Sequence, residues 1–233
     1  MNCFILTLFG DPIPWLDKYI ENCNNVKGYD WLIFTDKVDY DVMVKKNVTI
    51  LRMTIDEYSD LFERKLGRKP GYLTTEKFWD MRPAFGIIFE DYLHDYSFWG
   101  TTDHDCVYGN LNKFIDLNCD IWTNDPYPTI CGHLTLWKNT EKVNNLFKEY
   151  SLWEDMLFGE TNHILTRPLS GSLSPMSWTT SKLYDEGKIK INYDFDCQEN
   201  DKKPHKITYK EGLFSDGREI VVYHFRQTKR YPW

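Results

Sequence analysis

Short apolar runs and amphipathic segments alternate along the first half of the chain. Apolar runs predict three buried strands, at residues 3–9, 30–35 and 48–53. Helical spacing of apolar residues predicts helices at 14–22 and 56–66, and Gly67 predicts where the second helix ends. This alternation is typical of a mainly parallel sheet with helices on both faces.

The segment 72–94 also carries apolar residues at helical spacing, with Thr74 or Thr75 as its expected N-cap. Pro83 lies in its middle. Because proline has no N–H to donate to the preceding turn, we expect two helices or a kink there. A strand at 96–101 follows and leads directly into a pair of aspartates.

The order of elements changes in the second half. Patterning predicts one capped helix at 140–150 and strands at 119–123, 129–137, 188–194, 206–213 and 219–226. The Ser-Asp-Gly sequence at 215–217 predicts a turn that pairs the last two strands as a C-terminal β-hairpin. The polar residues 196–204 predict a surface loop. The whole pattern predicts an α/β protein with a mixed, mainly parallel sheet flanked by helices.

Length and composition limit the class of protein. The chain has 233 residues, enough for one large domain or one domain with an appendage. Hydrophobic residues make up 42% and aromatic residues 16%, which excludes wholesale disorder. The net charge of −7 argues against general nucleic-acid binding, which needs a basic surface. A nucleotide ligand stays open, because a bound cation can neutralise its phosphates.

The chain carries no targeting or membrane signal that we can identify. Residues 1–9 are apolar but lack a basic segment and run into Gly10, so no signal peptide is expected. No stretch reaches the ~20 apolar residues of a membrane span. The six cysteines are scattered without a CxxC pair, which predicts reduced, mostly buried thiols. These features predict a cytoplasmic protein without an integral membrane segment.

Asp103 and Asp105 are the strongest indication of chemistry. Carboxylates at positions i and i+2 of an extended chain point to the same side, so both can bind one divalent cation. The aromatic run 98–100 predicts a buried strand just before them, where carboxylates without a cation or donors are costly to desolvate. Asp36 ends another predicted strand, and ligands of parallel sheets bind at the carboxyl ends of strands. A Mg²⁺ or Mn²⁺ ion held there predicts a diphosphate ligand.

Two blocks of sequence carry a resemblance, residues 77–86 (KFWDMRPAFG) and 98–110 (FWGTTDHDCVYGN). Both are similar to a family of small polysaccharide-biosynthesis glycosyltransferases found in bacteria and large viruses. Shorter matches lie at 34–36, 132–134 and 223–226, and the similarity runs from about residue 3 to 229. One departure is His104, where the family more often has an apolar residue. Because it lies between the two aspartates, we expect its side chain to face the other way.

The resemblance implies a GT-A (Rossmann-like) glycosyltransferase with a DxD motif. It implies one domain, with a nucleotide-binding half at about 1–110 and an acceptor half at about 111–233. Asp105 would ligate the metal, with Asp103 on the metal or the ribose, and His224 would be a third ligand. An imidazole ligand suits Mn²⁺ better than Mg²⁺.

The resemblance also implies roles around the nucleotide-sugar donor, for which a UDP-sugar is expected. Asp36 would face the nucleobase or ribose, while Lys77, Asp80 and Arg82 would lie beside the nucleotide-sugar. Lys229 would contact the diphosphate.

The glycan acceptor would lie near Gly132 and His133. Glu154 and Asp155 would supply the base of an inverting enzyme, and in a retaining enzyme the leaving phosphate could take the proton. The sequence does not decide between the two.

Structural roles are open for several of these residues. His224 could be a core histidine, Asp36 a helix cap and Lys229 part of a solvated basic tail. Arg82 could pair with Asp80.

Two other functions also stay open beside a hexosyl- or pentosyltransferase. One is a metal-dependent phosphohydrolase of nucleotides or sugar phosphates, although such enzymes usually carry more clustered ligands for two cations. The other is a non-catalytic carbohydrate-binding protein.

Overall fold

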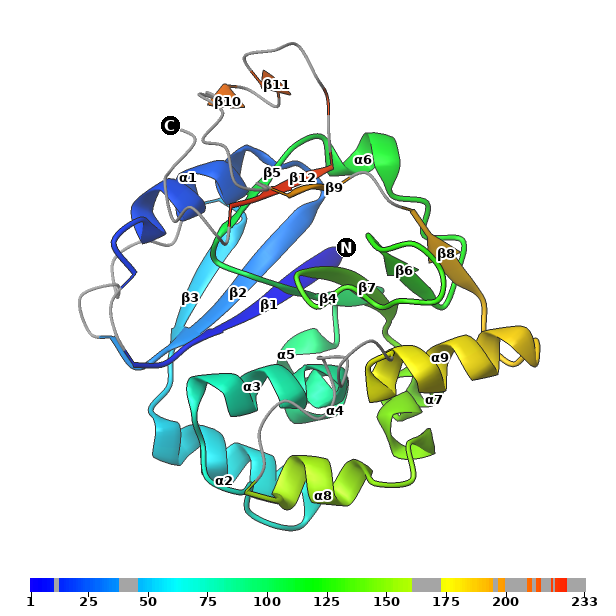
Figure 1. Ribbon diagram of the computed structural model, residues 1–233. Helices are drawn as coiled ribbons and strands as arrows, with labels where there is room; N and C mark the ends of the chain where they lie inside the picture. Colours follow the sequence, from blue (N-terminus) through cyan, green and yellow to red (C-terminus); the bar gives the residue numbers. More distant parts are fainter. Residues whose placement is uncertain are drawn as a thin grey trace.

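A seven-stranded sheet forms the centre of the molecule (Figure 1). Its order is β3 (Val48–Arg52), β2 (Tyr29–Thr35), β1 (Asn2–Leu8), β4 (Phe98–Thr102), β7 (Leu134–Lys138), β6 (Ile121–Thr123) and β8 (Ile191–Tyr193). Strands β1 to β4 run parallel, β7 is antiparallel to both β4 and β6, and β8 is parallel to β6. The mixed, mainly parallel sheet predicted from the sequence is confirmed. The computed structural model describes residues 1–10, 13–37, 46–160, 173–194, 197–199, 209–210, 213–214, 219 and 221–225.

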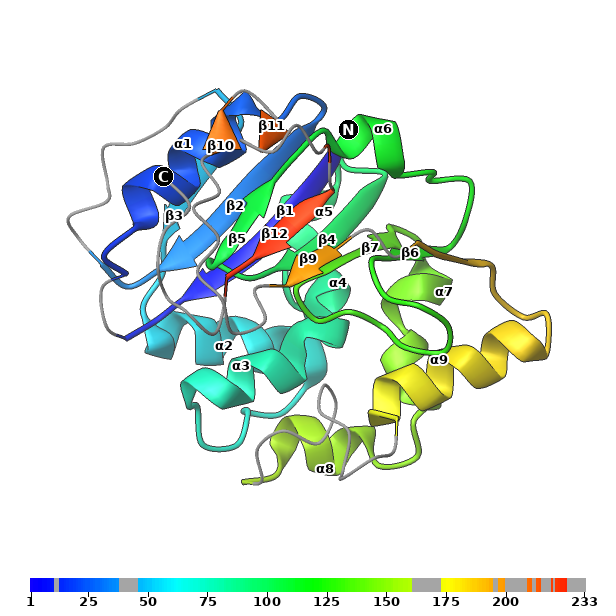
Figure 2. The same ribbon diagram turned by 45° about the horizontal axis from the view of Figure 1, so that its top comes forward.

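Helices cover both faces of this sheet (Figures 1 and 2). One face carries α1 (Leu16–Asn25) and α6 (Leu111–Phe114). The opposite face carries α2 (Ile55–Leu66), α3 (Thr75–Met81), η2 (Arg82–Ala84), α4 (Phe85–Ile88), α5 (Glu90–Leu93), α7 (Glu141–Asn144), η3 (Leu146–Glu149), α8 (Trp153–Phe158) and α9 (Pro175–Asp185). Within the described residues, no helix is long and apolar enough to span a membrane.

Strand alternation divides the core between the two faces. Phe98 belongs to the cluster under α1, while the adjacent Trp99 belongs to the cluster under the larger helical layer. Both side chains are buried because β4 has neighbours on both sides and helices on both faces. The five described cysteines are all buried thiols outside any disulfide, as predicted.

A capping box begins α2, whereas the sequence prediction rested on apolar spacing and on Gly67. Thr54 accepts from the Glu57 N–H at 3.1 Å, and the Glu57 carboxylate accepts from the Thr54 N–H at 2.7 Å. Gly67 ends the helix with φ of +79°, a left-handed conformation that glycine adopts without strain.

The predicted break at Pro83 is confirmed, but the segment 72–94 is more divided than expected. Thr74 caps α3, accepting from the Lys77 N–H at 3.1 Å. Pro83 lies in the 3₁₀ turn η2, and Phe89 (φ −100°, ψ 17°) interrupts the helix again between α4 and α5. Arg82 is thereby placed on a turn instead of inside one continuous helix.

Two predictions in the second half were too long. The strand predicted at 129–137 begins only at Leu134, because side-chain bonds hold the preceding residues in a loop. Cys131 N–H donates to the Thr123 hydroxyl at 2.9 Å, and the Thr135 hydroxyl donates to the Cys131 carbonyl at 2.6 Å. The helix predicted at 140–150 divides into α7 and η3.

The pairing of the C-terminal strands differs from the prediction. A short hairpin exists, but it joins β10 (Tyr209–Lys210) to β11 (Leu213–Phe214). Strand β12 (Val222–His224) pairs instead with β5 (Cys106–Tyr108), antiparallel, and with β9 (Cys197–Glu199), parallel. Strand β9 lies within the predicted loop 196–204, and the predicted turn 215–217 lies outside the described residues. The pairing of strands that are distant in sequence does not affect the local periodicity of either strand. The hydrophobic pattern therefore could not predict the sheet of β5, β12 and β9.

Candidate metal-binding and active site

The two aspartates lie at the turn between β4 and β5. Every residue of β4 is buried, and Asp103 follows directly at the carboxyl end of the strand. Asp105 precedes β5, which turns away from the main sheet and pairs with β12. The side chains of Asp103 and Asp105 are 26% and 16% exposed, so both carboxylates are largely withdrawn from water.

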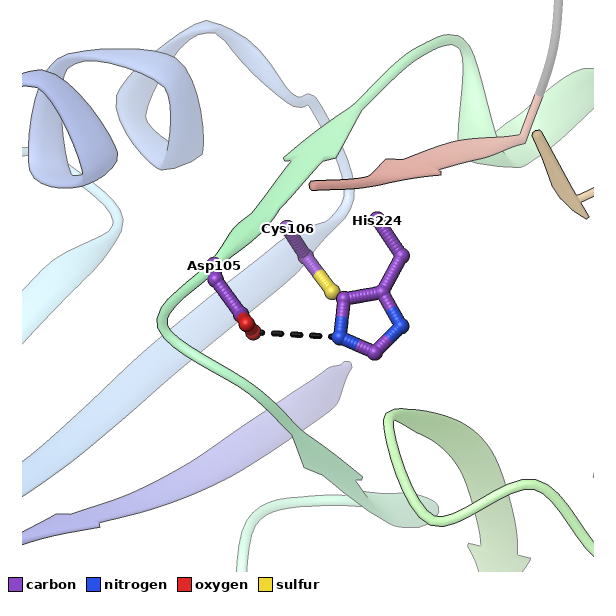
Figure 3. A group of neighbouring side chains, drawn as sticks. All are labelled: Asp105, Cys106 and His224. Atoms are coloured by element: carbon purple, nitrogen blue, oxygen red, sulfur yellow. Dashed lines mark ion pairs between the residues drawn. The ribbon is translucent and has the colours of Figure 1, made fainter. Parts of the chain in front are cut away.

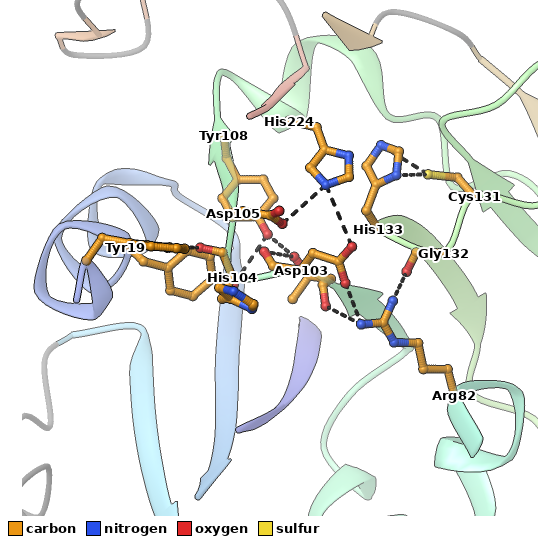
Figure 4. Close-up of polar contacts among 12 residues, drawn as sticks. Tyr19, Arg82, Asp103, His104, Asp105, Tyr108, Cys131, Gly132, His133 and His224 are labelled. Carbon is orange, nitrogen blue, oxygen red and sulfur yellow. Dashed lines mark hydrogen bonds and ion pairs between the residues drawn. The ribbon is translucent and has the colours of Figure 1, made fainter. Parts of the chain in front are cut away.

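His224 approaches both carboxylates from β12 (Figures 3 and 4). It is paired with Cys106 in the β5–β12 ladder, and the Phe225 N–H donates to the Asp105 carbonyl at 3.0 Å. Its Nε2 lies 3.2 Å from Asp105 Oδ1 and 3.8 Å from Asp103 Oδ2. The strand pairing therefore carries the imidazole to the DxD turn.

Arg82 holds Asp103 in place from the turn η2 (Figure 4). Its guanidinium pairs with Asp103 Oδ1, and it also donates to the Gly132 carbonyl at 2.7 Å and the Thr102 carbonyl at 3.4 Å. Arg82 therefore pairs with Asp103, not with the neighbouring Asp80 considered from the sequence.

Opposing effects set the charge of Asp103. Burial raises the pKa of this carboxyl, but the charges of Arg82, His224 and His133 outweigh burial and hold the pKa well below its usual range. Asp103 is a carboxylate at neutral pH. Its second oxygen, Oδ2, is the one that faces His224.

Gly132 and His133 lie beside the same cluster. The His133 ring centroid is 4.3 Å from that of His224, with 35° between the planes. Its Nδ1 lies 3.0 Å from the sulfur of Cys131, and Gly132 offers its carbonyl to Arg82. The structure thus brings the two residues predicted for the acceptor next to the predicted metal ligands.

His104 faces away from the cluster, as its position between the aspartates predicts. Its ring stacks on Trp15 at 5.6 Å between centroids, and the Trp15 indole N–H donates to the His104 carbonyl at 2.9 Å. Burial lowers the pKa of His104. This contact anchors the tip of the DxD turn to the start of α1.

Buried polar groups fix β5 against α1 and β4. Asn22 accepts from the Tyr108 N–H at 2.8 Å and donates to the Tyr108 carbonyl at 3.1 Å, so it satisfies both backbone groups of that residue. The Tyr108 hydroxyl contacts the hydroxyls of Thr102 and, at 3.3 Å, Tyr19. These bonds hold both ends of the DxD turn, one at Thr102 and the other at Tyr108.

A pocket opens beside Arg82, the partner of Asp103, with an empty volume of about 320 Å³. Its lining residues come from η2, β4, β7, the loop before β7 and the start of α9: Arg82, Pro83, Thr101, Ile130, Cys131, Gly132, Trp137, Ser174 and Met176. The lining is mostly apolar, and Arg82 connects it to Asp103. Such a pocket next to charged groups is typical of a small-molecule site.

Three predicted donor-site residues have other contacts. Asp36 follows β2, two strands from β4, and its Oδ1 lies 3.8 Å from Lys37 Nζ. Lys77 is fully buried and donates to the Met156 carbonyl. Burial lowers the pKa of Lys77, and the charge of the buried Asp80 partly offsets this. Their assignment to the nucleotide-sugar stays a prediction.

The predicted bases lie elsewhere on the molecule. Glu154 and Asp155 are exposed in the first turn of α8. Helix α8 is at the bottom of the helical layer in Figure 1, whereas β5 and β12 lie above the sheet. The structure does not bring these two carboxylates to the cluster. Lys229 lies outside the described residues.

The clustered donors suit a divalent cation. One imidazole nitrogen and two carboxylate oxygens converge. His224 Nε2 lies 3.2 Å from Asp105 Oδ1 and 3.8 Å from Asp103 Oδ2. Ligands bonded at about 2.1 Å to one cation lie roughly 3 Å apart. Arg82 occupies the outer oxygen of Asp103 and leaves the inner one for the ion. The residues present therefore fit a Mn²⁺ or Mg²⁺ ion.

Cys106 is the member of this cluster that the sequence prediction missed. The ligand atoms of Asp105, Cys106 and His224 lie within 4.8 Å of one another. The only sequence signal is its place directly after Asp105. Its nearness to His224 depends on the β5–β12 pairing, which the patterning did not predict.

Comparison with known proteins places the chain in a sequence family. A sequence family described as "Family of unknown function (DUF6625)" matches residues 4–168. The chain belongs to this family. Comparison with curated proteins gives no sequence match.

Solved structures share the fold. Mouse xyloside xylosyltransferase 1, in its apo form, aligns with a TM-score of 0.52 and 8% identity over 99% of each chain. The galactosyltransferase LgtC, crystallised with donor and acceptor sugar analogues, aligns with a TM-score of 0.53 and 9% identity over 98% of this chain and 88% of that one. The fold is therefore the GT-A fold of glycosyltransferases, as the resemblance implied.

Proposed function

We propose that the protein is a metal-dependent glycosyltransferase that moves a sugar from a nucleotide-diphosphate donor to a glycan acceptor. The observation that carries this proposal is the convergence of Asp103, Asp105 and His224 at the carboxyl end of β4. In a GT-A fold this is where a metal-bound diphosphate is expected to lie. A UDP-sugar is the expected donor.

The proposed reaction breaks the sugar–phosphate bond of the donor and joins the sugar to an acceptor hydroxyl. The hydroxyl proton goes to the leaving phosphate in a retaining reaction or to a base in an inverting one. A Mn²⁺ or Mg²⁺ ion held by Asp103, Asp105 and His224 would stabilise the negative charge that grows on the departing diphosphate. Arg82 positions Asp103 by pairing with its outer oxygen.

The pocket beside Arg82 is the proposed place for the transferred sugar. It is bounded by Arg82 and Gly132, and Arg82 connects it to Asp103. Its mostly apolar lining with Arg82 at one side suits a small polar ligand held by few charged contacts. His133, next to His224 and after Gly132, is placed to contact either the donor sugar or the acceptor hydroxyl. The proposal gives Glu154 and Asp155 no role.

Substitution at Asp105 tests the function. With Mn²⁺, an acceptor and a panel of nucleotide-sugars, the wild type should release nucleoside diphosphate, and Asp105→Ala should abolish both donor binding and release. The exposed aspartate of α1 provides a control, since Asp17→Ala removes a carboxylate outside the cluster. Full activity in Asp105→Ala would refute the site.

The two alternatives give different results in the same assays. A phosphohydrolase would release phosphate without any acceptor. A carbohydrate-binding protein would show no joint thermal stabilisation by UDP and Mn²⁺, whereas a transferase should show it.

A further inference from the structure

A thiol lies inside the proposed metal cluster. Cys106 and His224 are directly opposite in the antiparallel β5–β12 pair, and opposite residues project from the same face of such a pair. The Cys106 sulfur therefore points toward the imidazole, with the Asp105 carboxylate beside both (Figure 3). The three ligand atoms all lie within 4.8 Å of one another, and Cys106 is 1% exposed.

We propose that Asp105, Cys106 and His224 form a site for a thiophilic divalent cation of the zinc class, with the Cys106 sulfur as a direct ligand. This goes beyond the oxygen- and nitrogen-bound Mn²⁺ of the proposed function. It shares two residues with that site but depends on the thiol, which the manganese assignment does not use.

The donor set favours zinc on chemical grounds. Thiolate and imidazole are preferred ligands of Zn²⁺, and most sites bind Zn²⁺ more tightly than Mn²⁺. A tetrahedral zinc ion with bonds of about 2.0 to 2.3 Å separates its ligands by roughly 3.3 to 3.6 Å. His224 Nε2 and Asp105 Oδ1 are already 3.2 Å apart. The sulfur loses its proton to solvent when the bond forms.

The strand pairing makes this site largely preformed. Cys106 and His224 are held by ladder bonds, and Asp105 is held by the bond from the Phe225 N–H to its carbonyl. The three ligand atoms already lie within 4.8 Å of one another, so the backbone has brought the side chains close to the spacing that an ion needs. A preformed site loses less conformational entropy on binding than one assembled from loops.

The same geometry predicts that bound Zn²⁺ opposes nucleotide binding. This consequence rests on the proposed function. Three protein ligands fill three of the four positions of a tetrahedral ion and leave one open. A diphosphate that chelates through two oxygens needs two positions. Zn²⁺ should therefore occupy the cluster without the nucleotide and oppose nucleotide binding, whereas Mn²⁺ promotes it.

Cys131 is a second buried thiol near the cluster, so its substitution is a matched control for the substitution of Cys106. Its sulfur lies 3.0 Å from His133 Nδ1, and the His133 ring lies beside His224. Both cysteines are buried and both lie near an imidazole. Cys131 is outside the group of three converging ligand atoms.

Cobalt spectroscopy tests the assignment. Co²⁺ added to the full-length wild type should give a thiolate-to-cobalt charge-transfer band with the visible absorption of a tetrahedral ion. Cys106→Ser should lose the band and bind Zn²⁺ about 100-fold more weakly or worse, while Cys131→Ser should keep both. Co²⁺ binding without the band, or a band lost only in Cys131→Ser, would overturn the proposal, as would no Co²⁺ binding.

A second measurement needs no variant, in case Cys106→Ser does not fold. X-ray absorption at the zinc edge of the wild type loaded with one equivalent of Zn²⁺ should show a sulfur at about 2.3 Å. A first shell of oxygen and nitrogen only would refute the thiolate ligand. The proposed function is tested by a different experiment, the joint thermal stabilisation by Mn²⁺ and UDP. The zinc site and the proposed function can therefore fail independently of each other.

Discussion

The imidazole of His224 lies 3.2 Å from the carboxylate of Asp105, although one residue is on the last described strand and the other is near the middle of the chain. The antiparallel pairing of β12 with β5 produces this contact. The metal cluster is therefore incomplete until the C-terminal strand is in place.

His224→Gln should remove most of the cation affinity. The substitution keeps a polar side chain of similar size but takes away the imidazole nitrogen between the two carboxylates. We expect the joint thermal stabilisation by Mn²⁺ and UDP to disappear and Mn²⁺ affinity to fall about 10- to 100-fold. His94→Gln, at an exposed position, is the control. Unchanged Mn²⁺ titrations in His224→Gln would exclude it as a ligand.

Arg82→Lys should reduce transfer although the positive charge is kept. The guanidinium contacts three acceptors at once, namely Asp103, Gly132 and Thr102. A single ammonium group cannot donate in all three directions with the same planar geometry. Charged hydrogen bonds contribute about 1.5 to 3 kcal/mol, so kcat/KM should fall roughly 10- to 100-fold.

The matched control for this change is Arg64→Lys, on the exposed side of α2. Equal kcat/KM values for wild type and Arg82→Lys would mean that Arg82 does not position Asp103 for the reaction.

The depressed pKa of Asp103 predicts an acid-dependent loss of stability. Because the folded-state pKa is below the unfolded value of about 3.9, Asp103 stabilises the fold at higher pH. This contribution is lost as pH falls through the unfolded value toward the folded one. In metal-free buffer, the free energy of unfolding should therefore drop more steeply below pH ~4 in the wild type than in Arg82→Met, which lacks the main lowering charge. Parallel pH profiles would contradict this account.

Gly100→Ala should destabilise the centre of the sheet. A Cβ on Gly100 would lie 2.7 Å from the Thr135 carbonyl oxygen and 2.8 Å from the Phe4 ring, and neither backbone nor packed ring can yield easily. We expect a loss of about 1 to 3 kcal/mol in denaturant unfolding. Gly132→Ala is the comparison, because its Cβ would meet only the Arg82 guanidinium, at 3.6 Å. Similar unfolding midpoints for both variants would argue against the close approach.

Local patterning predicted what depends on neighbouring residues. The apolar runs that form β1, β2 and β3, the end of α2 at Gly67 and the break at Pro83 are each determined within a few positions of the chain. Placing the DxD pair at the end of a buried strand needed no more than the aromatic run before it. For the same reason the α/β class could be derived from the order of elements alone.

The tertiary structure alone decided how these parts meet. Sequence patterning placed β12 in a hairpin, whereas its hydrogen bonds join it to β5 and β9, and this pairing brings His224 and Cys106 together. Likewise, the partner of Arg82 is the distant Asp103 instead of the nearby Asp80, because the turn at η2 directs the guanidinium to the end of β4. Periodicity records only which face of an element is buried. Which elements become neighbours depends on packing across the whole chain, and the composition of the site follows from that packing.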